Sequence, residues 1–268
     1  TMSNPSPTIA GALAILLVQA RLAWKSPAQN RAHLEQQLDR CDKPFNLAVF
    51  PETFTTGFLG DPNLPSEDMD GPTLAWMKSL AAKHRAALAG SAVIVVDGQR
   101  FNRFLLVTAQ GEVQHYDKRH LFGYGGENQR YVAGRERCVM RLGDWRICPQ
   151  ICYDLRFPVW CRNRGDYDML MFVANWPGKR IHHWTALLRA RAIENQAWVI
   201  GLNRVGEDGN GVAYPGHSQV YDPGGTLIMD LQSNEEARLI ELQLAHVAAT
   251  RGEYPFQADA DDFELAKS

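Results

Sequence analysis

Residues 147–158 read ICPQICYDLRFP and place Cys152 where an apolar strand gives way to a turn that leads toward a helix. A thiol at such a turn can be activated by neighbouring charges and by the amide groups that open a helix. The backbone N–H of Tyr153 could then help to bind an oxyanion. A lone cysteine on an apolar strand is more often a small buried hydrophobic residue. This segment alone therefore leaves both interpretations open.

Two other short apolar strands also end in ionisable residues. Glu52 follows the strand predicted over 47–50, and a carboxylate so close to the core is poorly solvated, which suits a general base. Lys118 follows the strand 113–116 and opens the glycine-rich segment 118–135, from which its ammonium group could stabilise an oxyanion. Taken singly, Glu52 could cap a turn and Lys118 could be a solvated charge. Together with a cysteine, they are the side chains of a thiol hydrolase that needs no histidine.

The composition excludes several classes. The chain has 268 residues, 28 Lys and Arg against 30 Asp and Glu, a formal net charge of −2 and 45% hydrophobic residues. A near-neutral chain does not favour nucleic-acid binding, and the apolar content is too high for a disordered protein. The most apolar stretch, residues 9–18, is too short to span a membrane and lacks the basic start of a secretory signal. Five cysteines, an odd number, indicate a reducing compartment, and we expect the cytoplasm.

Apolar periodicity predicts helices and strands within one domain over residues 1–268, because no linker, repeat or low-complexity segment divides the chain. The predicted helices are 27–39, 73–85, 181–196 and a short one ending near 251. The predicted strands are 9–18, 47–50, 88–96, 104–109, 113–116, 138–142, 145–148, 169–174, 198–202, 218–221, 226–229 and 239–242. This pattern indicates an α/β fold of layered sheets with helices outside.

Motifs of other enzyme classes are missing from the sequence. It contains no G-x-S-x-G, no H-E-x-x-H, no P-loop and no complete dinucleotide fingerprint. Cys148 and Cys152 have no second pair or nearby histidine that would complete a zinc site. A redox role for these two cysteines is the other alternative, but on a strand they would lie about 13 Å apart, too far for a disulfide.

The sequence resembles the nitrilase, or carbon–nitrogen hydrolase, superfamily from the first strand to about residue 230. The segments that carry the resemblance are 50–52 (FPE), 116–122 (YDKRHLF), 126–128 (GEN), 151–158 (ICYDLRFP) and 190–195 (ARAIEN). The resemblance implies that Glu52 is the general base, Lys118 the oxyanion-stabilising cation and Cys152 the nucleophile. It also implies that Glu127 supports Lys118, and that no metal or organic cofactor takes part.

For the fold, the resemblance implies an α-β-β-α sandwich that dimerises into an extended αββα-αββα assembly. The tail, from about 250 to 268, is then expected at the dimer interface or at the surface. The expected partners are a small-molecule amide and a second copy of the chain, with no nucleic acid and no membrane.

Three further segments resemble the bacterial omega-amidases, which hydrolyse the terminal amide of alpha-ketoglutaramate and alpha-ketosuccinamate. These segments are 174–177 (ANWP), 203–206 (NRVG) and 214–218 (YPGHS). An amidase, nitrilase or carbamoyl hydrolase of another specificity is the alternative within the superfamily. A catalytically silent scaffold is a more remote alternative, against which the intact Glu52, Lys118 and Cys152 argue.

An omega-amide of this type carries a carboxylate at its far end, which the fork of an arginine guanidinium would suit. The candidate substrate-binding residues are Arg119, Arg156, Arg180, Asn175 and Trp176. Arg156 could instead be a buried partner of Asp154, and Trp176 could instead pack in the core.

Overall fold

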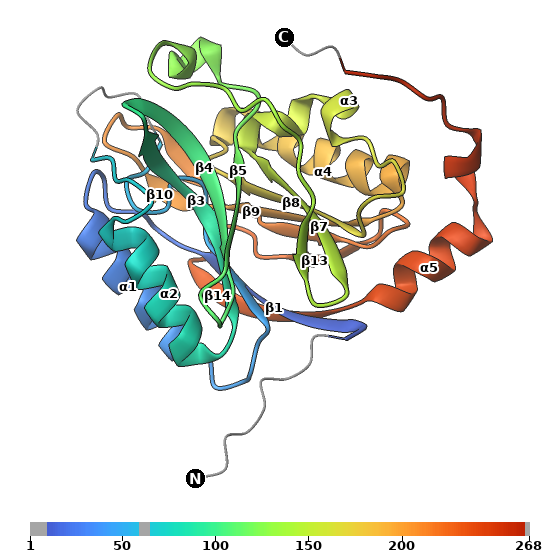
Figure 1. Cartoon of the computed structure of the whole chain (residues 1–268), viewed down its shortest axis with the longest axis horizontal. Coiled ribbons are helices and arrows are strands. Elements are labelled where there is room, and N and C mark those ends of the chain that lie inside the picture. Colours follow the sequence, from blue (N-terminus) through green and yellow to red (C-terminus); the bar gives the residue numbers. More distant parts are fainter. Residues whose placement is uncertain (1–9, 59–64, 266–268) are drawn as a thin grey trace.

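Two six-stranded sheets lie face to face in the computed structural model, which describes residues 10–58 and 65–265 (Figure 1). The first sheet, in the order β14-β1-β2-β3-β4-β5, contains β1 (Ala12–Gln19), β2 (Leu47–Val49), β3 (Ala87–Val96), β4 (Gln99–Val107), β5 (Val113–Asp117) and β14 (Glu236–Gln243). The second sheet, in the order β13-β12-β9-β8-β7-β6, contains β6 (Met140–Leu142), β7 (Trp145–Ile151), β8 (Met169–Ala174), β9 (Trp198–Asn203), β12 (Gln219–Tyr221) and β13 (Leu227–Asp230). A small separate hairpin is formed by β10 (Val205–Glu207) and β11 (Ala213–Pro215).

Helices cover the outer faces of both sheets, which confirms the predicted α-β-β-α sandwich (Figure 1). The first sheet is covered by α1 (Pro27–Asp39) and α2 (Pro72–His84), and the second by α3 (Pro158–Cys161) and α4 (Ile181–Asn195). The helix α5 (Leu244–Glu253) leads into the C-terminal tail. Within the described ranges, no helix is long and apolar enough to cross a membrane.

The side chains of β1 show why two apolar layers form. Leu13, Ile15 and Leu17 belong to the core cluster between the two sheets, whereas Leu16 and Val18 belong to the cluster beneath α1 and α2. Successive side chains of a strand point to opposite faces, so an uninterrupted apolar run suits a strand that is covered on both sides.

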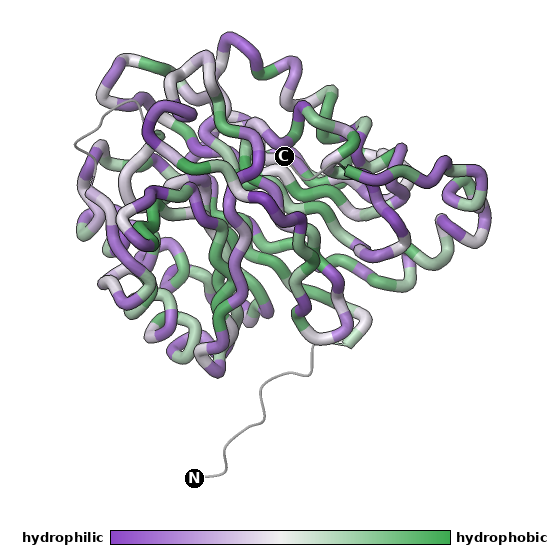
Figure 2. The backbone as a smooth tube through the Cα atoms, turned by 45° about the horizontal axis from the view of Figure 1, so that its top comes forward, coloured by the Kyte–Doolittle hydropathy of each residue, from purple (hydrophilic) through white to green (hydrophobic). Residues whose placement is uncertain are grey.

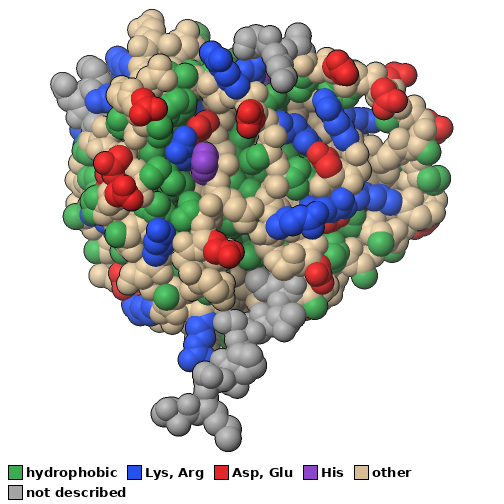
Figure 3. Space-filling model, in the orientation of Figure 1, with side chains coloured by type: hydrophobic (Ala, Val, Ile, Leu, Met, Phe, Trp, Pro, Cys, Tyr) green, Lys and Arg blue, Asp and Glu red, His purple; other side chains and the backbone are tan. Residues whose placement is uncertain are grey.

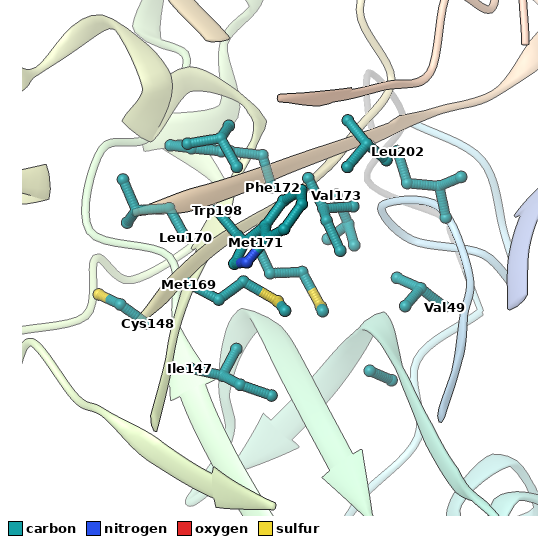
Figure 4. Close-up of a cluster of buried hydrophobic side chains, with 14 of the residues drawn as sticks. Val49, Ile147, Cys148, Met169, Leu170, Met171, Phe172, Val173, Trp198 and Leu202 are labelled. Carbon is teal, nitrogen blue, oxygen red and sulfur yellow. The ribbon is translucent and has the colours of Figure 1, made fainter. Parts of the chain in front are cut away.

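The same pattern runs through the other central strands. Figure 2 shows the hydrophobic stretches concentrated in the strands, and Figure 4 shows part of the cluster between the sheets. In that cluster Val49 of β2 lies opposite side chains of β7, β8 and β9, among them Ile147, Met171 and Leu202.

Several strands begin or end at other residues than the sequence predicted, β4 and β7 among them. β4 starts at Gln99 and not at 104, because Asp97 and Gly98, with φ of 49° and 76°, form a two-residue turn that pairs Gln99 directly with Val96. β7 continues to Ile151, three residues beyond the predicted end and through Pro149. Proline is tolerated there because β6 pairs with β7 only up to Ile147, which leaves that edge of the strand open.

Three smaller differences concern the first strand, the last strand and the glycine-rich segment. β14 is longer than predicted because it pairs along the whole of β1. The predicted first strand began at Ile9, which lies outside the described residues. The segment 118–135 is a loop as predicted, but it contains the short 3-10 turns η1 (Gly123–Gly125) and η2 (Glu127–Gln129).

Candidate active site

Glu52, Lys118 and Glu127 form a buried ionic cluster at the ends of the central strands. The ammonium group of Lys118 donates to Glu52 Oε1 at 2.9 Å and to the two carboxylate oxygens of Glu127 at 3.1 and 2.9 Å. Glu52 and Glu127 are 0% exposed and Lys118 is 1% exposed. Glu52 follows β2 and Lys118 follows β5, and the strands β3 and β4 lie between these two. The long side chain of Lys118 therefore reaches Glu52 across the end of the sheet. Two carboxylates and one ammonium group give this cluster a net charge of −1.

Burial and charge together set the protonation of this cluster. Burial alone would lower the pKa of Lys118, but the charges of Glu127 and Glu52 outweigh it, and the pKa of Lys118 rises. Burial raises the pKa of Glu127, Lys118 opposes that rise, and the charge of Glu52 adds to it. Lys118 is therefore a permanent cation at neutral pH.

Asn102 on β4 is a part of this cluster that the sequence reasoning missed. Its Nδ2 donates to Glu52 Oε1 at 2.9 Å and to Glu127 Oε1 at 3.3 Å, and the residue is 0% exposed. The sequence carried no signal for it, because Asn102 lies between Arg100 and Arg103 and before the predicted strand 104–109. Asn102 thus links the two carboxylates.

Asn175, which follows β8, holds the backbone and the carboxylate of Glu52. The backbone N–H of Asn175 donates to Glu52 Oε2 at 2.8 Å, and its Nδ2 donates to the Glu52 carbonyl at 2.9 Å and to Thr53 Oγ1 at 3.0 Å. Thr53 has a φ of +44°, a strained value for a β-branched residue. The side chain of Asn175 is therefore directed at the Glu52 segment, and its contact with substrate stays a prediction.

Cys152 lies at the sharp turn between β7 and η3 (Cys152–Arg156). Its φ is +43°, and its Sγ lies 4.0 Å from the carbonyl oxygen of Asn175. Burial raises the pKa of this thiol well above its ordinary value, and the negative charge of Glu52 raises it further, while Lys118 opposes both. The resting thiol is therefore protonated, and its reaction needs a base close by.

The buried carboxylate of Asp154 ties the cysteine turn to the segment that follows Lys118. It accepts hydrogen bonds from the Ile151 N–H at 3.0 Å and from the Tyr116 hydroxyl at 2.9 Å. It also accepts from the His120 N–H at 2.9 Å and lies 2.8 Å from His120 Nδ1. The alternative in which Arg156 pairs with Asp154 is wrong, because these donors occupy the carboxylate.

A small pocket opens at Cys152 and carries positive charge. The guanidinium of Arg156 lies 4.8 Å from the ring centre of Trp176, and that of Arg180 lies 5.4 Å from the ring centre of Phe122. None of the described residues that line the pocket is acidic. They are Phe58, Phe122, Cys152, Tyr153, Arg156, Trp176, Pro177 and Arg180.

Of the predicted substrate-binding residues, Arg156, Arg180 and Trp176 thus line the pocket, and Arg119 does not. The Nη1 of Arg119 donates to the Gly134 carbonyl at 3.2 Å, and its guanidinium lies 5.4 Å from the ring centre of Trp160. The placement of Arg119 at the substrate is therefore corrected.

The wider surface carries both signs of charge. On the face shown in Figure 3, Lys and Arg side chains are interspersed with Asp and Glu, in keeping with the net charge of −2. Within residues 10–58 and 65–265, no group of three or more His, Cys, Asp or Glu side chains is arranged to hold a metal ion.

A buried thiol beside a carboxylate and a carboxylate-bound lysine, on an α-β-β-α sandwich, indicates an enzyme that hydrolyses carbon–nitrogen bonds through a cysteine. The profile of the carbon–nitrogen hydrolase family matches residues 15–252, and the chain belongs to this family. The predicted membership of the nitrilase superfamily is thereby confirmed, and the protein is an amide-hydrolysing enzyme.

Known relatives agree with the omega-amidase resemblance. The chain is 44% identical to the omega-amidase YafV of Escherichia coli (strain K12) over 254 residues, which cover 94% of this chain and 98% of that protein. It is 30% identical to the 2-oxoglutaramate amidase of Bacillus subtilis (strain 168) over 246 residues, 90% of this chain and 95% of that protein. The crystal structure of XC1258 from Xanthomonas campestris, a CN-hydrolase superfamily protein, matches with a TM-score of 0.93 and 44% identity over 95% of this chain and 99% of that one.

Proposed function

We propose that this enzyme is an omega-amidase, which hydrolyses the terminal amide of a small dicarboxylate monoamide to the acid and ammonia. The substrates are of the alpha-ketoglutaramate and alpha-ketosuccinamate type. The observation that carries the proposal is a cysteine beside a buried Glu–Lys–Glu cluster, at a pocket lined by Arg156 and Arg180 and, among the residues that the structure describes, by no acid. The amide would lie at Cys152 and the distal carboxylate at the guanidinium groups. The activities named for the relatives support this assignment.

In the first half-reaction, Glu52 takes the proton of Cys152 while Sγ attacks the amide carbon. The proton goes to Oε2, because Oε1 accepts from the Lys118 ammonium group and from Asn102, whereas Oε2 accepts only from the uncharged Asn175, from its N–H at 2.8 Å and its Nδ2 at 3.4 Å. Lys118 and the Tyr153 N–H stabilise the oxyanion. Glu52 then donates its proton to the amide nitrogen as the C–N bond breaks, and ammonia leaves a thioester on Cys152.

In the second half-reaction, a water molecule enters the position that ammonia has left. Glu52 takes one proton of this water while its oxygen attacks the thioester carbon. The C–S bond breaks, the acid leaves, and Glu52 returns the proton to the thiolate of Cys152. Glu127 takes no proton in this scheme and keeps Lys118 in place.

We also propose a single domain over residues 1–268 that forms a homodimer in the cytoplasm. The dimer is supported by the family resemblance and by apolar side chains on the tail, where Tyr254 is 49% exposed and Phe256 is 61% exposed. The cytoplasm is supported by five cysteines that are all free. Sedimentation analysis of the wild type and of Phe256→Ser tests the dimer: a monomeric wild type would contradict it.

An ammonia-release assay over a panel of substrates tests the proposed activity. The panel contains alpha-ketoglutaramate, alpha-ketosuccinamate, nitriles of matching length and carbamoyl compounds. We expect the two omega-amides to give the highest kcat/KM. A higher kcat/KM for a nitrile or a carbamoyl compound would replace the omega-amidase assignment with one of the alternatives.

A further inference from the structure

Arg156 is held at the pocket by two neighbours, Trp176 and His183. Its guanidinium lies 4.8 Å from the ring centre of Trp176, and its Nη2 lies 3.1 Å from Nδ1 of His183, near the start of α4. Within the described part of the chain, no carboxylate forms an ion pair with this guanidinium. Its remaining donors are therefore available to an anion in the pocket.

The contact with His183 has only one possible polarity. A guanidinium can donate hydrogen bonds but cannot accept them, so Nδ1 of His183 must be the acceptor and its proton must lie on Nε2. This requires a neutral imidazole, and burial, with the nearby His182, Arg156 and Arg180, lowers the pKa of His183. His183 does not itself line the pocket.

We propose that His183 is a positioning residue that sets the affinity of the enzyme for the distal carboxylate of its substrate by fixing the guanidinium of Arg156. The inference rests on the proposed function, because it assigns Arg156 to the carboxylate of an omega-amide. Stacking on Trp176 fixes the plane of the guanidinium, and the hydrogen bond to His183 fixes its rotation within that plane. With both constraints the free donors face the pocket before the substrate arrives, so less conformational entropy is lost on binding.

The inference separates substrate affinity from chemistry. Among the described residues, no hydrogen bond or ring contact joins His183 to a residue that moves protons or binds the oxyanion, so its loss should change KM and leave kcat nearly unchanged. Its effect should also depend on the substrate carboxylate, because an amide without that group makes no use of Arg156.

The test compares variants of His183 on two substrates in the full-length enzyme. The substrates are alpha-ketoglutaramate and pentanamide, which has the same number of carbons and no carboxylate. His183→Leu should raise KM for alpha-ketoglutaramate roughly fivefold to tenfold, the scale of one net hydrogen bond, with kcat within about twofold. Its kcat/KM for pentanamide should stay at the wild-type value. His183→Asn, whose Oδ1 can accept at the position of Nδ1, should restore most of the affinity.

The neighbouring His182 provides the matched control, because it is exposed and touches only the ring of His183 among the aromatic contacts. His182→Leu should leave both substrates unaffected. A wild-type KM in His183→Leu, an equal loss on pentanamide, or no recovery in His183→Asn would overturn the inference while the omega-amidase activity stands. Absence of wild-type turnover on alpha-ketoglutaramate would instead refute the proposed function, and with it this inference.

Discussion

The variant Lys118→Met tests how the buried cluster combines stability with catalysis. It keeps a side chain of similar length and removes the charge between Glu52 and Glu127, both of which are fully buried. The net charge of the cluster changes from −1 to −2. Removing one partner of a buried ion pair costs about 3–5 kcal/mol, so the free energy of unfolding should fall by about that amount. Losing one oxyanion-stabilising donor costs roughly 10²–10³ in rate, so kcat should fall at least that far.

The double variant Lys118→Met/Glu127→Gln separates the two effects. The net charge of its cluster is −1 again, from Glu52 alone. We therefore expect the double variant to regain most of the lost stability and none of the lost activity. Urea unfolding near pH 7.5 measures the stability, and ammonia release from alpha-ketoglutaramate measures the activity. The loss of unfolding free energy in Lys118→Met should shrink as the pH falls. Burial already raises the pKa of Glu127, and without Lys118 this carboxyl protonates more readily, which removes one of the two negative charges. A single variant with wild-type stability, or with kcat within tenfold of wild type, would refute this reasoning.

Three more predictions follow from single contacts. Wild-type enzyme, quenched with acid during turnover of alpha-ketoglutaramate, should give mass-spectrometric evidence of an acyl group on Cys152; an adduct on another cysteine would show that the nucleophile is wrong. Asn102→Leu should lower kcat about tenfold with KM nearly unchanged, because the two hydrogen bonds of Asn102 go to the carboxylates of Glu52 and Glu127 and not to the pocket. A change confined to KM would contradict this role of Asn102. Burial raises the pKa of Cys148 from 9.0 to about 11, so this thiol ionises at a lower pH in the unfolded chain than in the folded one. Between these two pH values the free energy of unfolding should therefore fall by up to about 1.4 kcal/mol per pH unit. Cys148→Ala should show a shallower decline in urea unfolding, and an unchanged slope would contradict the assignment.

The sequence predicted the layers and the strand ends well because both depend on local pattern. Apolar runs such as 169–174 identify strands that are covered on both faces, and Glu52 and Cys152 follow buried strands of this kind. Lys118 follows β5, which is only partly buried. β2 and β5 belong to one sheet, with β3 and β4 between them, and β7 belongs to the facing sheet. The long side chain of Lys118 spans the distance to Glu52 that the strand order leaves between them.

The contacts that refine the site could not be predicted, because each joins segments that are far apart in the chain. Asn102 reaches Glu52 across 50 positions, and Asp154 accepts from Tyr116 across 38. No periodicity or motif encodes such pairs. The direction of a long side chain cannot be predicted from sequence for the same reason. Arg119 and Arg156 are equally plausible substrate-binding residues in the sequence, and only the structure shows that Arg119 lies against Trp160 and Arg156 against Trp176.

The central claim is that Cys152 carries out the hydrolysis of an omega-amide. Ammonia release from alpha-ketoglutaramate by the wild type, by Cys152→Ala and by the control Cys41→Ala tests it most directly. Cys41 is partly exposed and lies outside the site, so the control removes a thiol without touching the cluster. We predict turnover by the wild type and by Cys41→Ala, and none above background by a folded Cys152→Ala. Turnover by Cys152→Ala at the wild-type rate would contradict the account.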